Sequence, residues 1–171
     1  MTDILVVIDM QNDFIDGALG THEAEAIVPA VKKRIEEHRG EVYFTRDTHS
    51  ENYLSTEEGK KLPVVHCVRG TRGWEIRSEL DALRKTPAID KPTFGSVKLA
   101  EMLFERSRHE DISITLIGVC TDICVLSNAV LLKAYMPEVQ ISVEAQLCAG
   151  VTKKSHENAL EAMKMCQISV I

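Results

Sequence analysis

The chain has 171 residues, enough for a domain with a sizeable core, and we predict a single domain over residues 1–171. Hydrophobic residues make up 44% and charged residues 27%, as in globular proteins, and a net charge of -6 with no convincing basic cluster argues against nucleic acid or an anionic membrane as the main partner. No apolar run approaches the length of a membrane span. The five cysteines form no pair with zinc-finger spacing. Because their number is odd and we recognise no signal peptide, we expect reduced thiols and a cytoplasmic protein.

The first predicted strand is the apolar, β-branched run at residues 4–8, which ends at Asp9. A carboxylate at the carboxyl end of a buried strand either caps a turn or serves as a general base. Ala24–Arg39 carries apolar residues on one stripe and charged residues opposite, which predicts an amphipathic helix closed by Gly40.

The next predicted strand, Glu41–Thr45, continues into Asp47 and His49. Residues two apart in an extended segment point to the same side, so this pair suits a metal ion, although a hydrogen-bonded turn is the commoner explanation. Glu51–Lys61 is polar and irregular, which favours a surface loop or a short lid helix.

Leu62–Val68 is predicted to form a short strand that contains His66. A histidine with apolar neighbours is more often a hydrogen-bonded core residue than a ligand. Together with Asp47 and His49, however, His66 completes a set of two imidazoles and one carboxylate, which leaves metal positions open for water or substrate.

Trp74–Arg84 has apolar residues on one face and predicts a short helix. A short strand at residues 88–90 follows and leads to Lys91, which Pro92 holds in an extended conformation. A lysine is usually solvated, but one fixed at this turn can direct its ammonium into a cleft. Ser96–Arg106 predicts another helix.

Ile112–Ile117 has the composition of a strand buried on both faces, and helical spacing begins shortly after it. Cys124 lies at this junction. If Thr121 or Asp122 caps the helix, Cys124 lies in its first turn, where the helix dipole favours a thiolate and therefore a nucleophile. The alternative is that Cys124 is a small buried hydrophobic residue.

The carboxyl-terminal part predicts a strand at residues 139–143, a helix from Thr152 to Met165 and a final strand at residues 168–171. Strands that alternate with helices indicate an α/β fold with three α/β/α layers around a mostly parallel, doubly wound sheet of about six strands. Such folds bind ligands at the carboxyl ends of the strands, where the candidate residues fall.

Five motifs occur in a fixed order along nearly the whole chain. They are D-M-Q-N-D-F at 9–14, R-D-T-H at 46–49, H-C-V-R-G-T at 66–71, K-P-T-F-G-S at 91–96 and G-V-C-T-D-I-C-V at 118–125. This order resembles the isochorismatase-like cysteine hydrolase family, and within it most closely the nicotinamidase/pyrazinamidase branch.

The resemblance implies a role for nine residues. It implies the catalytic residues Asp9, Lys91 and Cys124, the metal ligands Asp47, His49 and His66, a cis peptide between Val119 and Cys120 near the oxyanion site, and ring packing of substrate by Phe14. The metal would be a divalent ion, with zinc favoured and iron or manganese as alternatives. The family also implies a homo-oligomer, a dimer or a tetramer.

The implied activity is hydrolysis of nicotinamide to nicotinate and ammonia through a cysteine thioester, in NAD salvage. Cys120 replaces a common alanine, Pro63 replaces a common tryptophan, and the loop before His66 is short. These departures keep open a related cysteine hydrolase acting on another small amide or ureido compound. A non-catalytic domain that binds a nucleotide or a partner is the other alternative, but the first strand is not followed by G-x-G-x-x-G.

Overall fold

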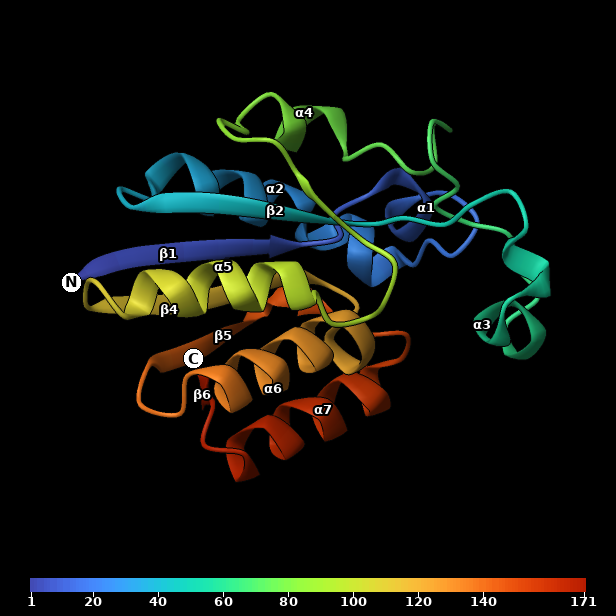
Figure 1. Cartoon of the computed structure of the whole chain (residues 1–171). Helices are drawn as coiled ribbons and strands as arrows, with labels where there is room; N and C mark the ends of the chain where they lie inside the picture. The colour runs from blue at the N-terminus through green and yellow to red at the C-terminus, as the bar shows by residue number, and fades with distance from the viewer.

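The computed structural model describes all 171 residues and contains one six-stranded parallel sheet with the order β3-β2-β1-β4-β5-β6 (Figure 1). The strands are β1 Thr2–Ile8, β2 Glu41–Asp47, β3 Ile89–Lys91, β4 Ile112–Val119, β5 Gln140–Ala149 and β6 Ser169–Val170. The predicted fold class is confirmed. None of the helices is both long enough and apolar enough to cross a membrane.

Helices cover both faces of the sheet. α5 (Val97–Ser107), α6 (Leu126–Tyr135) and α7 (Lys153–Met165) pack on one face, and α2 (His22–Glu37) packs on the other (Figure 1). The central strand β1 serves both cores because alternate side chains point to opposite faces. Ile4, Val6 and Ile8 join the core beneath α5 to α7, whereas Leu5 and Val7 join the core beneath α2.

The chain reverses its direction of travel across the sheet between β1 and β4, which lie side by side at the centre. In a doubly wound sheet this reversal opens the crevice in which ligands bind. β4 reaches β1 closely because Gly118 has φ 120° and no side chain; a Cβ there would lie 2.1 Å from the Ile8 carbonyl oxygen.

Two predicted elements are wrong in part. Leu62–Val68 is not a strand; it has one isolated bridge, between Val68 and His49, because β3 occupies the sheet edge and positive φ at Cys67 turns the chain. The helix predicted over Trp74–Arg84 is only α4, Ser78–Asp81. Tertiary contacts override its apolar spacing, since the Trp74 indole N–H donates to Thr48 Oγ1 at 2.8 Å and holds this part of the chain in turns.

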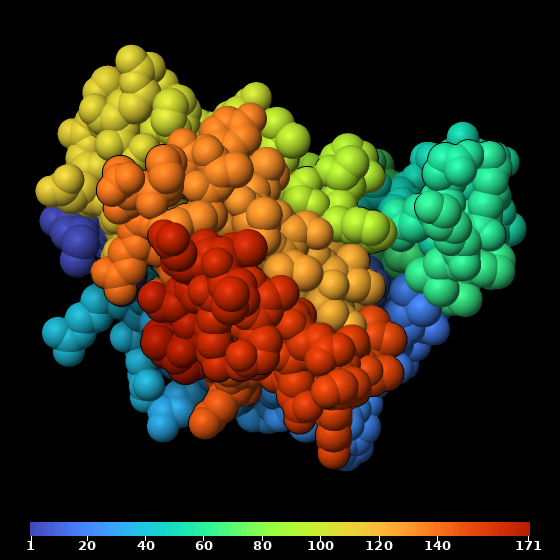
Figure 2. All heavy atoms as spheres, turned by 90° about the horizontal axis from the view of Figure 1, so that it is seen from below, coloured from blue at the N-terminus to red at the C-terminus, as the bar shows by residue number.

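The segment after β2 forms a small lobe. It contains a 3₁₀ turn, Tyr53–Ser55, and the short helix α3, Glu57–Lys61, so the short helix is confirmed as one of the two alternatives predicted for this segment. Figure 2 shows residues near 51–61 projecting beside the body of the molecule. A second short helix, α1 (Asn12–Ile15), follows β1. Both segments lie beyond the carboxyl ends of the strands, where the candidate residues gather.

Candidate active site

Cys124 lies in a tight helical turn that joins β4 to α6. The Val119–Cys120 peptide is cis, as the family resemblance implied, and Thr121–Val125 forms one turn of π-helix. The Val125 N–H donates to the Cys120 carbonyl at 3.1 Å. The turn therefore places Cys124 beyond the carboxyl end of β4, with 4% of the residue exposed.

The predicted caps of this helix are wrong. Neither Thr121 nor Asp122 caps it, because the first turn is closed by backbone bonds to the Cys120 carbonyl. Thr121 Oγ1 instead lies 2.8 Å from His156 Nδ1, and the Asp122 carboxylate accepts from the Val151 N–H at 3.1 and 3.3 Å. Both side chains thus fasten the Thr121–Val125 turn to the start of α7 and the residue pair before it.

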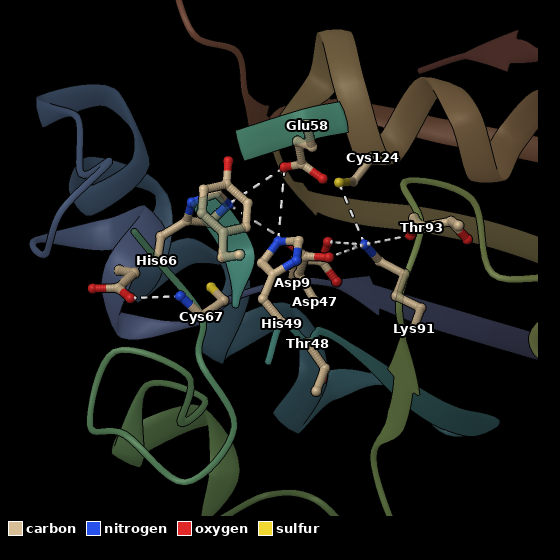
Figure 3. A network of polar contacts seen from close by, with 12 residues as sticks. Asp9, Asp47, Thr48, His49, Glu58, His66, Cys67, Lys91, Thr93 and Cys124 are labelled. Atoms are coloured by element: carbon tan, nitrogen blue, oxygen red, sulfur yellow. Dashed lines mark hydrogen bonds and ion pairs between the residues drawn. The ribbon is translucent and has the colours of Figure 1, made fainter. Parts of the chain in front are cut away.

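Three predicted catalytic side chains converge at the ends of three strands (Figure 3). Lys91 Nζ lies 2.6 Å from Asp9 Oδ2 and 3.4 Å from Cys124 Sγ. Asp9 is 0% and Lys91 1% exposed, so water screens their attraction very little. Thr45 Oγ1 donates to Asp9 Oδ1 at 2.7 Å and fixes the second carboxylate oxygen.

Burial controls the charge of this group. Desolvation raises the pKa of Asp9, and the nearby Lys91 ammonium opposes this only in part. Desolvation, and then the negative charge of Asp9, raise the pKa of Cys124 well above its ordinary value. Burial therefore acts against the thiolate that the helix terminus was expected to favour.

A second polar group adjoins the first and has the donor set of a metal site. Its members are Asp47, His49, Glu58 and His66, whose potential ligand atoms all lie within 4.8 Å of one another (Figure 3). Asp47 Oδ2 is 3.0 Å from His49 Nε2 and 3.7 Å from His66 Nε2. Glu58 Oε1 lies 3.7 Å from each of these nitrogens. Two imidazoles and two carboxylates at this spacing fit a divalent ion.

The surroundings orient the two histidines. His66 Nδ1 lies 2.8 Å from the Val64 carbonyl oxygen, an arrangement in which Nδ1–H donates and Nε2 keeps its lone pair for the cluster. The buried Tyr53 ring packs against both imidazoles, with centroids 4.7 Å from His49 and 4.9 Å from His66. The ring of Phe14, the predicted substrate contact, lies 5.5 Å from that of His66.

Asp47 connects the two groups. Its Oδ2 faces the histidines, while its Oδ1 lies 3.4 Å from Lys91 Nζ. Burial raises the pKa of Asp47, but the hydrogen bond from His49 and the charge of Lys91 outweigh it and lower the pKa overall. Asp47 is thus held as a carboxylate beside both groups.

Sequence reasoning missed two members of the site. Glu58 lies in the polar segment that we predicted as a surface loop or lid helix, and nothing in its sequence context distinguishes it from its neighbours. Gln11 is fully buried; its Nε2 donates to the Asp47 carbonyl at 2.8 Å, and its Oε1 accepts from the Asp47 N–H at 2.7 Å. The sequence signal that could have identified Gln11 is its position two residues after Asp9.

The chain is similar to known proteins over nearly its whole length. The family model described as the isochorismatase domain matches residues 3–171. An uncharacterized isochorismatase family protein, PncA of Bacillus subtilis (strain 168), is 30% identical over 94% of this chain and 93% of its own length.

Two solved structures extend the comparison. The pyrazinamidase of Pyrococcus horikoshii in complex with zinc superposes with a TM-score of 0.79 at 27% identity, over 100% of this chain and 99% of that one. The pyrazinamidase/nicotinamidase of Streptococcus mutans UA159 gives a TM-score of 0.81 at 28% identity, over 99% of this chain and 100% of that one.

Proposed function

This chain belongs to the isochorismatase family and is a nicotinamidase/pyrazinamidase-like hydrolase, and from that premise we propose that it hydrolyses nicotinamide to nicotinate and ammonia. The observation that carries the proposal is the buried contact of Lys91 Nζ with both Asp9 Oδ2, at 2.6 Å, and Cys124 Sγ, at 3.4 Å. A carboxylate and a thiol that both contact one buried ammonium suit nucleophilic acyl transfer.

The proposed first half-reaction forms a thioester. Asp9 accepts the thiol proton, and the Cys124 sulfur attacks the carboxamide carbon while the Lys91 ammonium stabilises the developing charges. The carbonyl electron pair moves to oxygen, where the backbone N–H groups of Cys120 and Cys124 stabilise it. The carbon–nitrogen bond then breaks, and Asp9 returns its proton to the leaving nitrogen, which departs as ammonia.

The second half-reaction uses the same groups. Asp9 accepts a proton from water as the water oxygen attacks the thioester carbon, and the same N–H groups stabilise the oxyanion. Collapse breaks the carbon–sulfur bond and Asp9 returns its proton to the Cys124 sulfur. The product leaves as nicotinic acid, which loses its own proton to water and becomes nicotinate.

We assign Asp47, His49, Glu58 and His66 to a divalent metal ion, for which zinc is favoured and iron or manganese are alternatives. When bound, the ion would supply a ligand position for the pyridine nitrogen, directly or through water, and so orient the ring. Phe14, beside His66, would pack against that ring.

A second candidate is a related cysteine hydrolase that acts on another small amide or ureido compound. Pro63 favours it, because this exposed residue offers no aromatic face to a pyridine. We also propose that the chain is one domain, assembles as a homo-oligomer, and acts in the cytoplasm in NAD salvage.

The deciding experiment measures ammonia release by the metal-loaded protein from nicotinamide, pyrazinamide and a panel of small amides and ureido compounds. We expect release from nicotinamide that is lost in Cys124→Ala and after chelation. Release only from another compound, still dependent on Cys124, would favour the second candidate. Unchanged release by a folded Cys124→Ala variant would refute both.

A further inference from the structure

Asn128 connects the nucleophile turn to the segment that follows Lys91. It lies in α6, one turn after Cys124, and is 1% exposed. Its Nδ2 donates to the Cys124 carbonyl at 2.8 Å and to the Phe94 carbonyl at 3.1 Å, while its Oδ1 accepts from the Ser96 N–H at 2.9 Å. Both amide hydrogens and the amide oxygen of Asn128 therefore take part in hydrogen bonds. Two of the three bonds go to the segment that follows Lys91, and the third goes to the Cys124 backbone.

The segment has few other attachments. Residues 92–95 make no hydrogen bond between backbone groups, so side chains hold them in place. Gly95 comes so close to α6 that a Cβ on it would lie 3.3 Å from the Ser127 carbonyl oxygen. Ser96 then caps α5 by accepting from the Leu99 N–H at 3.2 Å. The segment is thus set against α6, and Asn128 is the side chain that fastens it there.

The same segment helps to place the Lys91 ammonium. Lys91 Nζ donates to the Thr93 carbonyl at 3.2 Å and lies 3.4 Å from Cys124 Sγ. A continuous path of contacts therefore runs from Asn128 through residues 93–96 to the ammonium. Asn128 itself contacts the carbonyl of Cys124 but not its sulfur, so any effect on the chemistry acts through position.

We propose that Asn128 is a positioning residue, which sets the Lys91 ammonium against the Cys124 sulfur by clamping residues 93–96 onto the nucleophile helix. The inference rests on the proposed function only in that Cys124 is the nucleophile. It assigns to one buried amide the alignment of two groups, one at the end of β3 and one in the turn after β4, that are 33 residues apart in sequence. Displacement of a reacting group by about 1 Å can lower a rate about a hundredfold.

The test compares two substitutions of Asn128 with a control in the same helix. Asn128→Ala removes all three hydrogen bonds. Asn128→Ser keeps a hydroxyl that can bond the carbonyl four residues before it, but cannot reach the segment. The control is either Leu132→Val or Leu132→Ala, whichever loses as much stability in urea as the Asn128 variants do. Leu132 suits this purpose because it is buried in α6 and makes no hydrogen bond to the segment or to Cys124.

Two quantities are measured on the metal-loaded full chain: kcat and KM for nicotinamide, and the pH profile of Cys124 alkylation by iodoacetamide. We expect both Asn128 variants to lower kcat about ten- to a hundredfold and to change KM by less than about threefold. We also expect the alkylation midpoint to move to higher pH, because a displaced ammonium stabilises the thiolate less. Asp9 and Asp47, the other charges that act on Cys124, are unchanged.

Alkylation separates this inference from the proposed function, because it needs no substrate. If the wild-type protein does not hydrolyse nicotinamide, but the pH profile of Cys124 alkylation still shifts in the Asn128 variants, the proposed substrate is refuted and the positioning role is supported. Wild-type kcat and profile in Asn128→Ser would overturn the inference, since the segment would then need no clamp. Equal losses in the stability-matched Leu132 control would overturn it as well.

Discussion

Lys91 Nζ lies 2.6 Å from Asp9 Oδ2, and both side chains are almost completely excluded from water. Removal of one partner leaves a buried charge without compensation, whereas removal of both does not. We therefore expect Lys91→Met to lower the free energy of unfolding by about 3–5 kcal/mol.

The double variant Asp9→Asn, Lys91→Met separates stability from catalysis. Urea denaturation should show that it recovers much of the stability lost in Lys91→Met, while ammonia release stays absent because the base is gone. A double variant as unstable as the single one would show that the pair is not the source of the loss.

The pH profile of kcat/KM follows from the raised pKa values of Asp9 and Cys124. The proposed chemistry needs Asp9 without its proton and Cys124 with its proton. A raised pKa makes Asp9 hold its proton to higher pH, so the acidic limb should lie above the ordinary aspartate value of 3.8. The alkaline limb should likewise lie above the ordinary cysteine value of 9.0, because Cys124 keeps its proton longer. An acidic limb at or below 3.8 would contradict the assignment of Asp9 as base.

Glu58 should contribute to metal binding although it lies in the small lobe. Its carboxylate is 3.7 Å from both histidine nitrogens of the cluster. We expect Glu58→Gln to weaken the affinity for zinc by about tenfold or more in competition with a chelating indicator. Glu57→Gln is the matched control, since that neighbouring side chain is 82% exposed and pairs only with Lys60. Equal affinities in the two variants would remove Glu58 from the site.

Gln11 should hold the backbone of Asp47 in place. Gln11→Leu leaves the buried Asp47 N–H and carbonyl without their side-chain partner, at a cost of about 1–3 kcal/mol for each unsatisfied group. We expect a lower urea midpoint together with weaker zinc binding. Gln146→Leu makes the same chemical change at an exposed position and should stay within about 0.5 kcal/mol of the wild type. Similar losses at both positions would refute a specific role for Gln11.

Gly118 should tolerate no side chain. A Cβ at this position would lie 2.1 Å from the Ile8 carbonyl oxygen in the neighbouring central strand, so Gly118→Ala should lower the unfolding free energy by more than about 4 kcal/mol. Gly70→Ala is the control, because Gly70 also has positive φ, at 82°, but nothing lies within 4 Å of the added carbon. Its cost should be the backbone strain alone, about 1–3 kcal/mol. A thermal melt of the two variants would show whether the close approach or the φ angle matters more.

Local patterns predicted most of the fold. The apolar runs before Asp9 and Gly118 identified the two central strands, since a strand buried on both faces has a nearly continuous apolar sequence. Thr152 and Ser96 cap α7 and α5 close to where the helical spacing began. The pattern failed at Leu62–Val68 and Trp74–Arg84, where single contacts such as that from Trp74 to Thr48 decide the backbone path.

By itself, the sequence determined the parallel α/β fold and the residue types that end its strands, because alternation of apolar runs with amphipathic segments is a local property of the chain. Only the tertiary structure decided which of these residues meet. It brought Glu58 to His49 and His66, set Gln11 behind Asp47, and buried Cys124, which raises the pKa of its thiol. Those outcomes depend on packing between segments distant in sequence, which no local pattern encodes.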